Sequence, residues 1–167
     1  MLQIRIAERS DLANIVLIYN QAIRSRTATG DMDEFKVEDR HDWFDRHVPE
    51  KYPIYLAELE GEVRGFGTIS PYRPGRRAMD SVAEVSFFID YQHHKKGIGS
   101  RLLKHMMNEC KSLDIDCLLA ILLNINPASI ALLQRYGFEE WAYLPDIIQF
   151  EDTTCSHLYY GIKGLSK

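Results

Sequence analysis

The chain has 167 residues, a mass of 19.4 kDa, 46% hydrophobic residues and 26% charged residues. These values are typical of a globular protein and argue against disordered, collagen-like and coiled-coil classes, and the length predicts a single domain over residues 1–167. A net charge of −4 argues against a nucleic-acid binder. No apolar run reaches the ~18 residues that span a bilayer, so no membrane association is expected.

The charge is unevenly distributed along the chain. Residues 73–104 carry seven basic and three acidic side chains, so this segment has a local net charge of +4. A basic segment in an acidic protein indicates an anionic ligand at one place. The three cysteines are irregularly spaced and include no Cys-x-x-Cys pair. They indicate free thiols in a reducing cytoplasm rather than disulfides or a zinc site, and no metal is expected.

The first half of the chain predicts a strand, two helices and a hairpin. Residues 3–7 alternate between polar and apolar side chains, as in a strand, and Ser10 is the predicted N-cap of a helix that reaches Arg24. A second, acidic helix is predicted over residues 37–47, with Trp43 and Phe44 on its buried side. Strand-like runs at 54–59 and 63–70 flank a Glu-Gly-Glu turn.

The second half predicts a strand, helix, strand and helix followed by two strands. Residues 71–77 contain two prolines and a glycine and are expected to form a loop. The predicted elements are a strand at 83–89, an amphipathic helix from Ser100, a buried strand at 117–123, a helix from Pro127 that Gly137 ends, and two strands within 140–162. This order predicts a mixed α/β (α+β) sheet with one central crossover.

The segment between the strand at 83–89 and the next helix is the most informative. It reads His94-Lys95-Lys96-Gly97-Ile98-Gly99. Its two glycines let backbone N–H groups approach an anion, and the first turn of the helix adds unpaired N–H donors and a positive dipole end. The segment predicts a pyrophosphate site, and the alternative is a glycine turn with solvated lysines. It matches neither a Walker loop nor a dinucleotide fingerprint.

Two motifs resemble one known family. The segment from His94 to Gly99 resembles the Q/R-x-x-G-x-G/A signature of the GCN5-related N-acetyltransferases (GNAT). Asn126-Pro127-Ala128-Ser129-Ile130, followed by Tyr136-Gly137-Phe138, resembles the N-x-x-S/A…GF segment of that family. Ile18-Tyr19-Asn20 and residues 27–29 are similar to its phosphinothricin (methionine sulfoximine) acetyltransferase branch.

This resemblance covers nearly the whole chain and implies the GNAT fold. That fold has a mostly antiparallel central sheet, one parallel pair of strands that splays apart, and flanking helices. Dimers are common in the branch, so a homodimer is also expected.

The resemblance implies acetyl-CoA as the donor. The backbone of the strand at 83–89 would pair with the pantetheine arm, and the glycine segment would hold the pyrophosphate. Asn126 would hydrogen-bond the pantetheine, although an Asn before a helical Pro suits an N-cap equally well. The implied donor-site residues are Phe87, Phe88, Ile89, His94, Lys95, Lys96, Gly97, Ile98, Gly99, Ser100, Asn126 and Ser129.

Amine acetylation needs a base, and Glu84 is the candidate. A partly buried carboxylate in an apolar strand has a raised pKa, which suits a base near neutral pH, and the resembled branch has a glutamate at this place. The alternative is a strand-end glutamate that pairs with an arginine. Many superfamily members protonate the thiolate with a tyrosine at the place of Leu133. Tyr136 is the remaining candidate acid, although a tyrosine before Gly-Phe is more often a packing residue.

The acceptor site is expected in the loop before Glu84. Tyr72, Arg73 and Arg76 lie in this loop, and in the resembled branch arginines at this place meet the substrate carboxylate, to which the guanidinium offers a bidentate fork. The alternative is a solvated basic loop or a subunit contact.

These observations predict an acetyl-CoA-dependent N-acetyltransferase. The expected acceptor is the amine of a small amino acid or analogue, such as methionine sulfoximine or phosphinothricin, which attacks the thioester directly. Two alternatives are a peptide or protein N-terminal acetyltransferase and a non-catalytic acetyl-CoA sensor.

Overall fold

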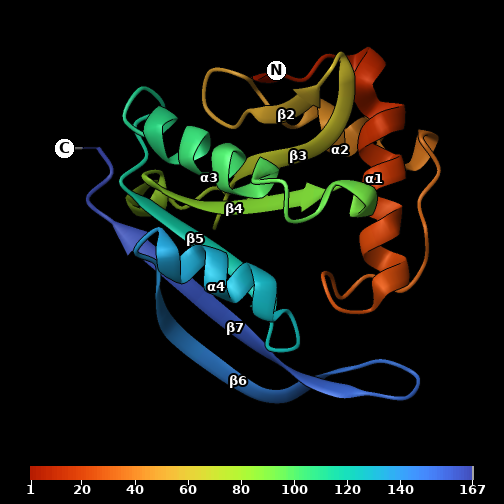
Figure 1. Ribbon diagram of the computed structural model, residues 1–167. Helices are drawn as coiled ribbons and strands as arrows, with labels where there is room; N and C mark the ends of the chain where they lie inside the picture. Colours follow the sequence, from red (N-terminus) through yellow and green to blue (C-terminus); the bar gives the residue numbers. More distant parts are fainter. Residues whose placement is uncertain (167) are drawn as a thin grey trace.

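Seven strands form one sheet in the computed structural model, which describes residues 1–166 (Figure 1). Their order across the sheet is β1-β2-β3-β4-β5-β7-β6, and every neighbouring pair is antiparallel except β4 and β5. The strands are β1 (Leu2–Ile6), β2 (Ile54–Leu59), β3 (Glu62–Pro71), β4 (Val82–Ile89), β5 (Cys117–Leu123), β6 (Glu139–Gln149) and β7 (Thr154–Lys163). The α-helices are α1 (Leu12–Ser25), α2 (His41–Asp45), α3 (Ile98–Glu109) and α4 (Pro127–Arg135). The predicted mixed sheet with one parallel pair is confirmed.

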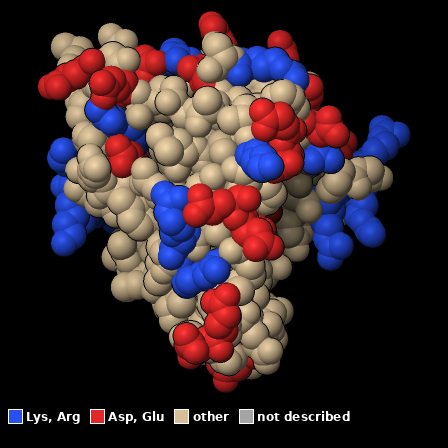
Figure 2. All heavy atoms as spheres, turned by 90° about the vertical axis from the view of Figure 1, so that its right-hand side faces the viewer, with Lys and Arg blue, Asp and Glu red and all other residues tan. Residues whose placement is uncertain are grey.

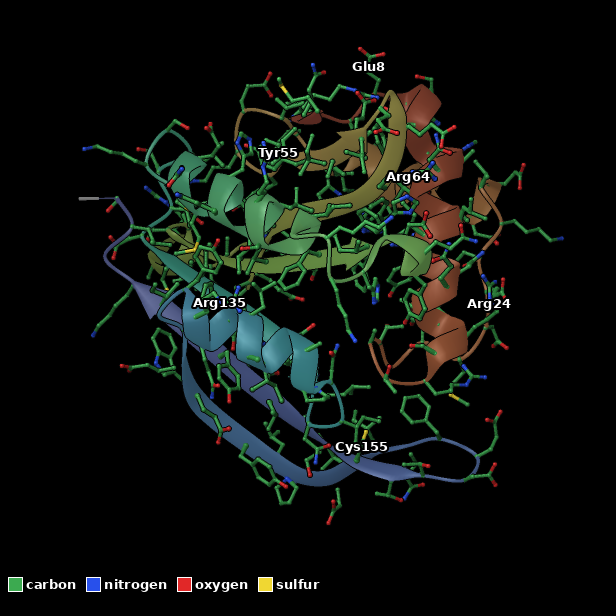
Figure 3. The ribbon with its side chains drawn as sticks, viewed as in Figure 1. Glu8, Arg24, Tyr55, Arg64, Arg135 and Cys155 are labelled. Carbon is green, nitrogen blue, oxygen red and sulfur yellow. The ribbon has the colours of Figure 1, made fainter. Side chains whose placement is uncertain are left out.

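The helices cover both faces of the sheet. Neighbouring residues of a strand point to opposite faces, so each strand can pack against helices on both sides. Tyr55 and Ala57 of β2 belong to the main apolar cluster with residues of α3 and α4. Ile54 and Leu56 of the same strand belong to a second cluster with residues of α1. Figure 3 labels Tyr55 between β2 and α3, and its ring meets the ring of His105 on α3 edge-on at a centroid distance of 4.7 Å.

Two local predictions in the first half are wrong. The predicted N-cap Ser10 lies instead within a 3₁₀ turn that precedes α1. The reason is the buried Asp11 carboxylate, which accepts a hydrogen bond from the Glu8 N–H at 2.8 Å and pairs with Arg5 at 2.7 Å.

The predicted helix over 37–47 is also shorter than expected. It is a 3₁₀ turn at Glu38–Arg40 followed by the five-residue α2. Just after the helix, His47 Nδ1 lies 2.9 Å from the Trp43 carbonyl oxygen. The backbone N–H of His47 donates to the Phe44 carbonyl oxygen at 3.0 Å. These two bonds close the helix, while Trp43 and Phe44 pack against the second apolar cluster as partly buried residues.

The parallel pair at the centre of the sheet is very short. Val82, Ala83 and Glu84 of β4 pair with the first three residues of β5, and beyond Glu84 the two strands diverge. β4 remains paired with β3 as far as Ile89, and β5 pairs with β7 along its whole length. Figure 1 shows the two strands parting toward the right-hand side. No helix among residues 1–166 is both long and apolar enough to cross a membrane.

Candidate active site

A cavity of about 730 Å³ lies where β4 and β5 diverge. Its wall is formed by the second half of β4, the loop before α3, the first turn of α3, the end of β5 and one side of α4. This volume lies within the range of sites that hold a drug-sized ligand or a cofactor. The predicted donor-site residues that line it are Phe87, Phe88, Ile89, His94, Lys95, Gly97, Ile98, Gly99, Ser100, Asn126 and Ser129. Lys96 does not line the cavity, and its side chain is exposed.

The edge of β4 that faces the cavity is open. Because residues 85–89 of β4 have no partner on the β5 side, their backbone groups on this edge make no strand hydrogen bonds. Backbone N–H and C=O groups need hydrogen-bond partners, which water or an extended ligand can supply. The edge can therefore accept an amide-bearing chain in the manner of an added strand.

The start of α3 has the geometry of an anion site. Gly97 is the N-cap with φ 77°, a conformation that favours glycine, and no side chain caps this helix. The N–H groups of the first turn therefore remain available, together with the positive end of the dipole of a twelve-residue helix. A Cβ at Gly99 would lie 3.5 Å from Leu132 and 3.6 Å from Ile89, which is ordinary contact. Packing within the protein therefore does not require glycine at position 99.

The loop that leads into α3 is anchored at Asp90. Its carboxylate accepts hydrogen bonds from the Gln92 N–H at 3.2 Å and contacts His93 Nδ1 at 3.0 Å. Arg64 reaches the same carboxylate from β3, with 3.4 Å between nitrogen and oxygen (Figure 3). Although burial opposes the charge, the hydrogen bonds from Gln92 and His93 hold the pKa of Asp90 below its usual value. The anchored carboxylate fixes the loop at the end of β4.

Asn126 is a helix cap and also lines the cavity. Its Oδ1 accepts a hydrogen bond from the Ser129 N–H at 3.2 Å, so the predicted N-cap is present. The hydroxyl of Tyr136 lies beside the first turn of α3, where it forms a hydrogen bond with Ser100 Oγ at 2.7 Å. Leu133 is fully buried and lines the cavity with an apolar side chain. The contact with Ser100 places the Tyr136 hydroxyl beside the predicted phosphate site.

Glu84 lies at the vertex where β4 and β5 separate, opposite Leu119 in the last parallel pair. Burial raises the pKa of its carboxyl, and a hydrogen bond from Ser86 opposes this shift in part. Glu84 shares its face of β4 with Phe88, which packs with residues of α1 in the second apolar cluster. The carboxyl therefore lies on the α1 and α2 side of the sheet and holds its proton to a higher pH than an exposed glutamate does.

Sequence reasoning missed His47, Ser70 and Arg135. His47 Nε2 lies 3.0 Å from Ser70 Oγ, and Ser70 is paired with Glu84 across β3 and β4. Arg135, in the last turn of α4, lines the main cavity (Figure 3). The helix pattern before Gly137 places Arg135 near a helix end, but no local pattern connects His47 to Glu84.

The predicted acceptor residues lie on the loop between β3 and β4. Ser70 pairs with Glu84 and Pro71 pairs with Ala83, so the loop begins next to the Glu84 pair. The Arg73 guanidinium lies 5.7 Å from the centroid of the Tyr72 ring, and Arg73 and Arg76 are exposed. In the described part of the chain neither arginine makes an ion pair, so both guanidinium groups are available to an anion.

Charges of both signs intermix over the side of the molecule that faces the viewer in Figure 2. No broad area of one sign covers this side, so attraction of an anion depends on local groups such as the first turn of α3. Among residues 1–166, no cluster of three or more His, Cys, Asp or Glu side chains could hold a metal ion.

Comparison with known proteins identifies the family. The sequence model of the family described as "Acetyltransferase (GNAT) family" matches residues 16–138. A Bacillus subtilis protein named "Putative phosphinothricin acetyltransferase YwnH" is 38% identical over 149 residues, which are 89% of this chain and 90% of that protein. The L-methionine sulfoximine/L-methionine sulfone acetyltransferase of Pseudomonas paraeruginosa is 31% identical over 87% of this chain and 85% of its own length.

A solved structure gives the same result for the fold. The ribosomal-protein-alanine N-acetyltransferase of Brucella melitensis superposes with a TM-score of 0.90 at 29% identity, over 96% of this chain and 99% of that chain. The chain therefore belongs to the acetyltransferase (GNAT) family. The predicted family and enzyme class, an acetyl-CoA-dependent N-acyltransferase, are confirmed.

Gly99→Val is expected to weaken CoA binding at least about tenfold, or about 1.4 kcal/mol. The added methyl groups would extend from between Ile89 and Leu132, both of which line the cavity, into the space predicted for the pyrophosphate. Isothermal titration with CoA measures the effect. Gly99→Ala is the matched control, because its Cβ makes only ordinary contacts, and it should bind CoA like the wild type. Equal affinity in both variants would contradict the placement of the pyrophosphate.

Proposed function

We propose that this protein transfers an acetyl group from acetyl-CoA to the primary amine of a small amino acid or analogue. The observation that carries the proposal is the half-buried carboxylate of Glu84, which lies where β4 and β5 separate and directly precedes the β4 residues that line a CoA-sized cavity. The relatives named for methionine sulfoximine and phosphinothricin acetylation support an amino-acid-like acceptor.

The donor is assigned to the cavity between β4 and β5. The open backbone edge of residues 85–89 suits the two amides of a pantetheine arm, and the first turn of α3 suits its pyrophosphate. Lys95 and Arg135 line the same cavity and supply positive charge toward the phosphates. Asn126 lines the same cavity at the start of α4, where its side-chain amide can donate to the pantetheine. Bound in this way, acetyl-CoA supplies a thioester carbonyl next to the vertex.

Glu84 is assigned as the base. An amino-acid ammonium is not nucleophilic, so it must lose a proton before it attacks the carbonyl. Because burial raises the pKa of Glu84, its carboxylate is a stronger base than an exposed glutamate. The proton passes to Glu84 or to a water molecule bound to it.

The departing thiolate is assigned no side-chain acid. Leu133 occupies the place where many superfamily members carry a tyrosine, and the Tyr136 hydroxyl is hydrogen-bonded to Ser100 beside the first turn of α3. A CoA thiolate is a fair leaving group, so solvent protonation is sufficient.

Glu84→Gln is expected to lower kcat at least about 100-fold, the lower range for a positioned base, and to leave the Kd for CoA unchanged. Because the base must be deprotonated, wild-type kcat/KM should rise with pH through the raised pKa of Glu84, and this limb should disappear in the variant. Release of free thiol from acetyl-CoA measures both effects. Asp80→Asn, an exposed substitution before β4, is the control. Equal loss of CoA binding and turnover would contradict the role as base.

The acceptor is assigned to the loop between β3 and β4, with the acceptor carboxylate at Arg73 and Arg76 beside Tyr72. The double variant Arg73→Ala/Arg76→Ala should raise KM for L-methionine sulfoximine about tenfold or more. It should leave KM for acetyl-CoA unchanged, and Lys111→Ala is the exposed control. Turnover of an alanine-initiated peptide in preference to the amino acids would favour a protein acceptor. Tight CoA binding without turnover of any acceptor would favour a sensor.

We also propose that the chain is one domain that forms a homodimer in the cytoplasm. All seven strands belong to one sheet, so calorimetry should show one unfolding transition. The three free cysteines fit a reducing compartment, and cell fractionation tests the cytoplasmic location. β6 is an edge strand whose exposed side chains include Trp141 at 45%, Tyr143 at 53% and Ile147 at 53%. Unpaired, apolar strand edges favour association.

Ile147→Lys is expected to shift the protein toward the monomer by placing a charge on this edge. Analytical ultracentrifugation measures the shift, and Leu17→Lys, an exposed substitution on α1, is the control. A monomeric wild type, or a dimer that this substitution leaves intact, would contradict the β6 interface.

A further inference from the structure

Ser70 lies beside the proposed base. It is the β3 residue directly opposite Glu84, and directly opposite residues point to the same face of an antiparallel pair. Cβ atoms in such pairs are about 4.5–5.5 Å apart. The Ser70 hydroxyl and the Glu84 carboxyl therefore border the same small region on the α1 and α2 side of the sheet.

The His47 ring determines the direction of the Ser70 hydroxyl. Nδ1 lies 2.9 Å from the Trp43 carbonyl oxygen, which can only accept, so Nδ1 carries the hydrogen. Burial lowers the pKa of His47, and the positive charges of Arg40 and Arg46 lower it further, so the ring is neutral at pH 7. A neutral ring with its hydrogen on Nδ1 has a lone pair on Nε2. Ser70 Oγ, at 3.0 Å, therefore donates its hydrogen to Nε2.

In this arrangement the Ser70 oxygen can only accept a hydrogen bond from any other partner. A hydroxyl has one hydrogen, and here His47 takes it. The neutral amine of an acceptor has a lone pair for attack and, if the amine is primary, two N–H groups. Glu84 accepts from one N–H group, and a second acceptor beside Glu84 is needed to fix the rotation of the amine about its C–N bond.

We infer that His47 and Ser70 form an orienting pair that accepts the second N–H of the acceptor amine and so selects primary over secondary amines. The inference rests on the proposed function, because it assumes that the amine is deprotonated at Glu84. His47 is a positioning residue that acts through Ser70, and Ser70 is the group that touches the amine. A secondary amine has only one N–H group and cannot satisfy both Glu84 and Ser70. The amine would then lose its hydrogen bond to the half-buried Ser70 oxygen.

The selectivity test compares L-methionine sulfone with N-methyl-L-methionine sulfone at saturating acetyl-CoA. The wild type should have a higher kcat/KM for the primary amine than for the secondary amine. Ser70→Ala should lower the ratio of these two kcat/KM values about tenfold and leave the affinity for CoA unchanged. His47→Phe should behave in the same way. His47→Gln should retain most of the ratio, because its amide oxygen can accept from Ser70. His105→Phe, a substitution on α3 at the other face of the sheet, is the matched control.

Two outcomes of this test would overturn the inference. One is an unchanged ratio in Ser70→Ala, and the other is an equal loss in His47→Gln and His47→Phe, which would indicate a packing role alone. A second measurement does not depend on turnover. Nitrogen NMR of ¹⁵N-histidine-labelled protein, with His47 assigned from the His47→Gln spectrum, should show the neutral Nδ1–H tautomer at pH 7.

The two measurements separate the inference from the proposed function. An Nε2–H tautomer or a charged His47 ring would overturn the orienting pair even if the enzyme is active. Failure of the wild type to acetylate either probe, with the tautomer as expected, would instead count against the proposed acceptor class.

Discussion

The three-residue pairing of β4 with β5 is the constraint on which the rest of the site depends. Each strand has a full partner on its other side, so the sheet remains continuous while its centre opens beyond Glu84. The open edges carry backbone donors and acceptors that have no strand partner, and leaving such groups without any partner is costly. An extended ligand with its own amides can satisfy them, and the same opening places the end of that ligand beside the vertex.

The local parts of this site could be predicted from the sequence because short-range chemistry specifies them. Gly97 has a positive φ that favours glycine, and Asn126 before Pro127 forms the N-cap that residue preference indicates. Strand β4 was expected within one residue of its observed start, because its apolar run is bounded by a loop and by a glycine segment. These signals are contained in a few consecutive residues, so no tertiary information was needed.

The acceptor side could not be predicted in the same way. The relation between His47 and Glu84 depends on the register of β3 with β4 and on the early end of α2, neither of which is a local property. The helix expected over 37–47 would have included His47, whereas the observed α2 ends at Asp45 and the His47 ring reaches Ser70. Ser10 failed as an N-cap for a related reason, since the long-range partner Arg5 and the burial of Asp11 override a local preference.

The side chains around the opening also favour direct transfer over an acyl-enzyme. None of the three cysteines in the described chain lines the main cavity, and burial raises the pKa of the Cys110 thiol to about 12. Ser86, Ser100, Ser129 and Thr27 line the cavity, but Ser86 bonds to the proposed base from the same strand and Ser100 is held by Tyr136. In the described chain no histidine, lysine or carboxylate hydrogen-bonds to the hydroxyl of Ser129 or Thr27. Without an activated nucleophile on the enzyme, the acetyl group has no intermediate carrier. Both substrates must then be present together, which the proposed donor cavity between the splayed strands and the proposed acceptor site on the Glu84 face allow.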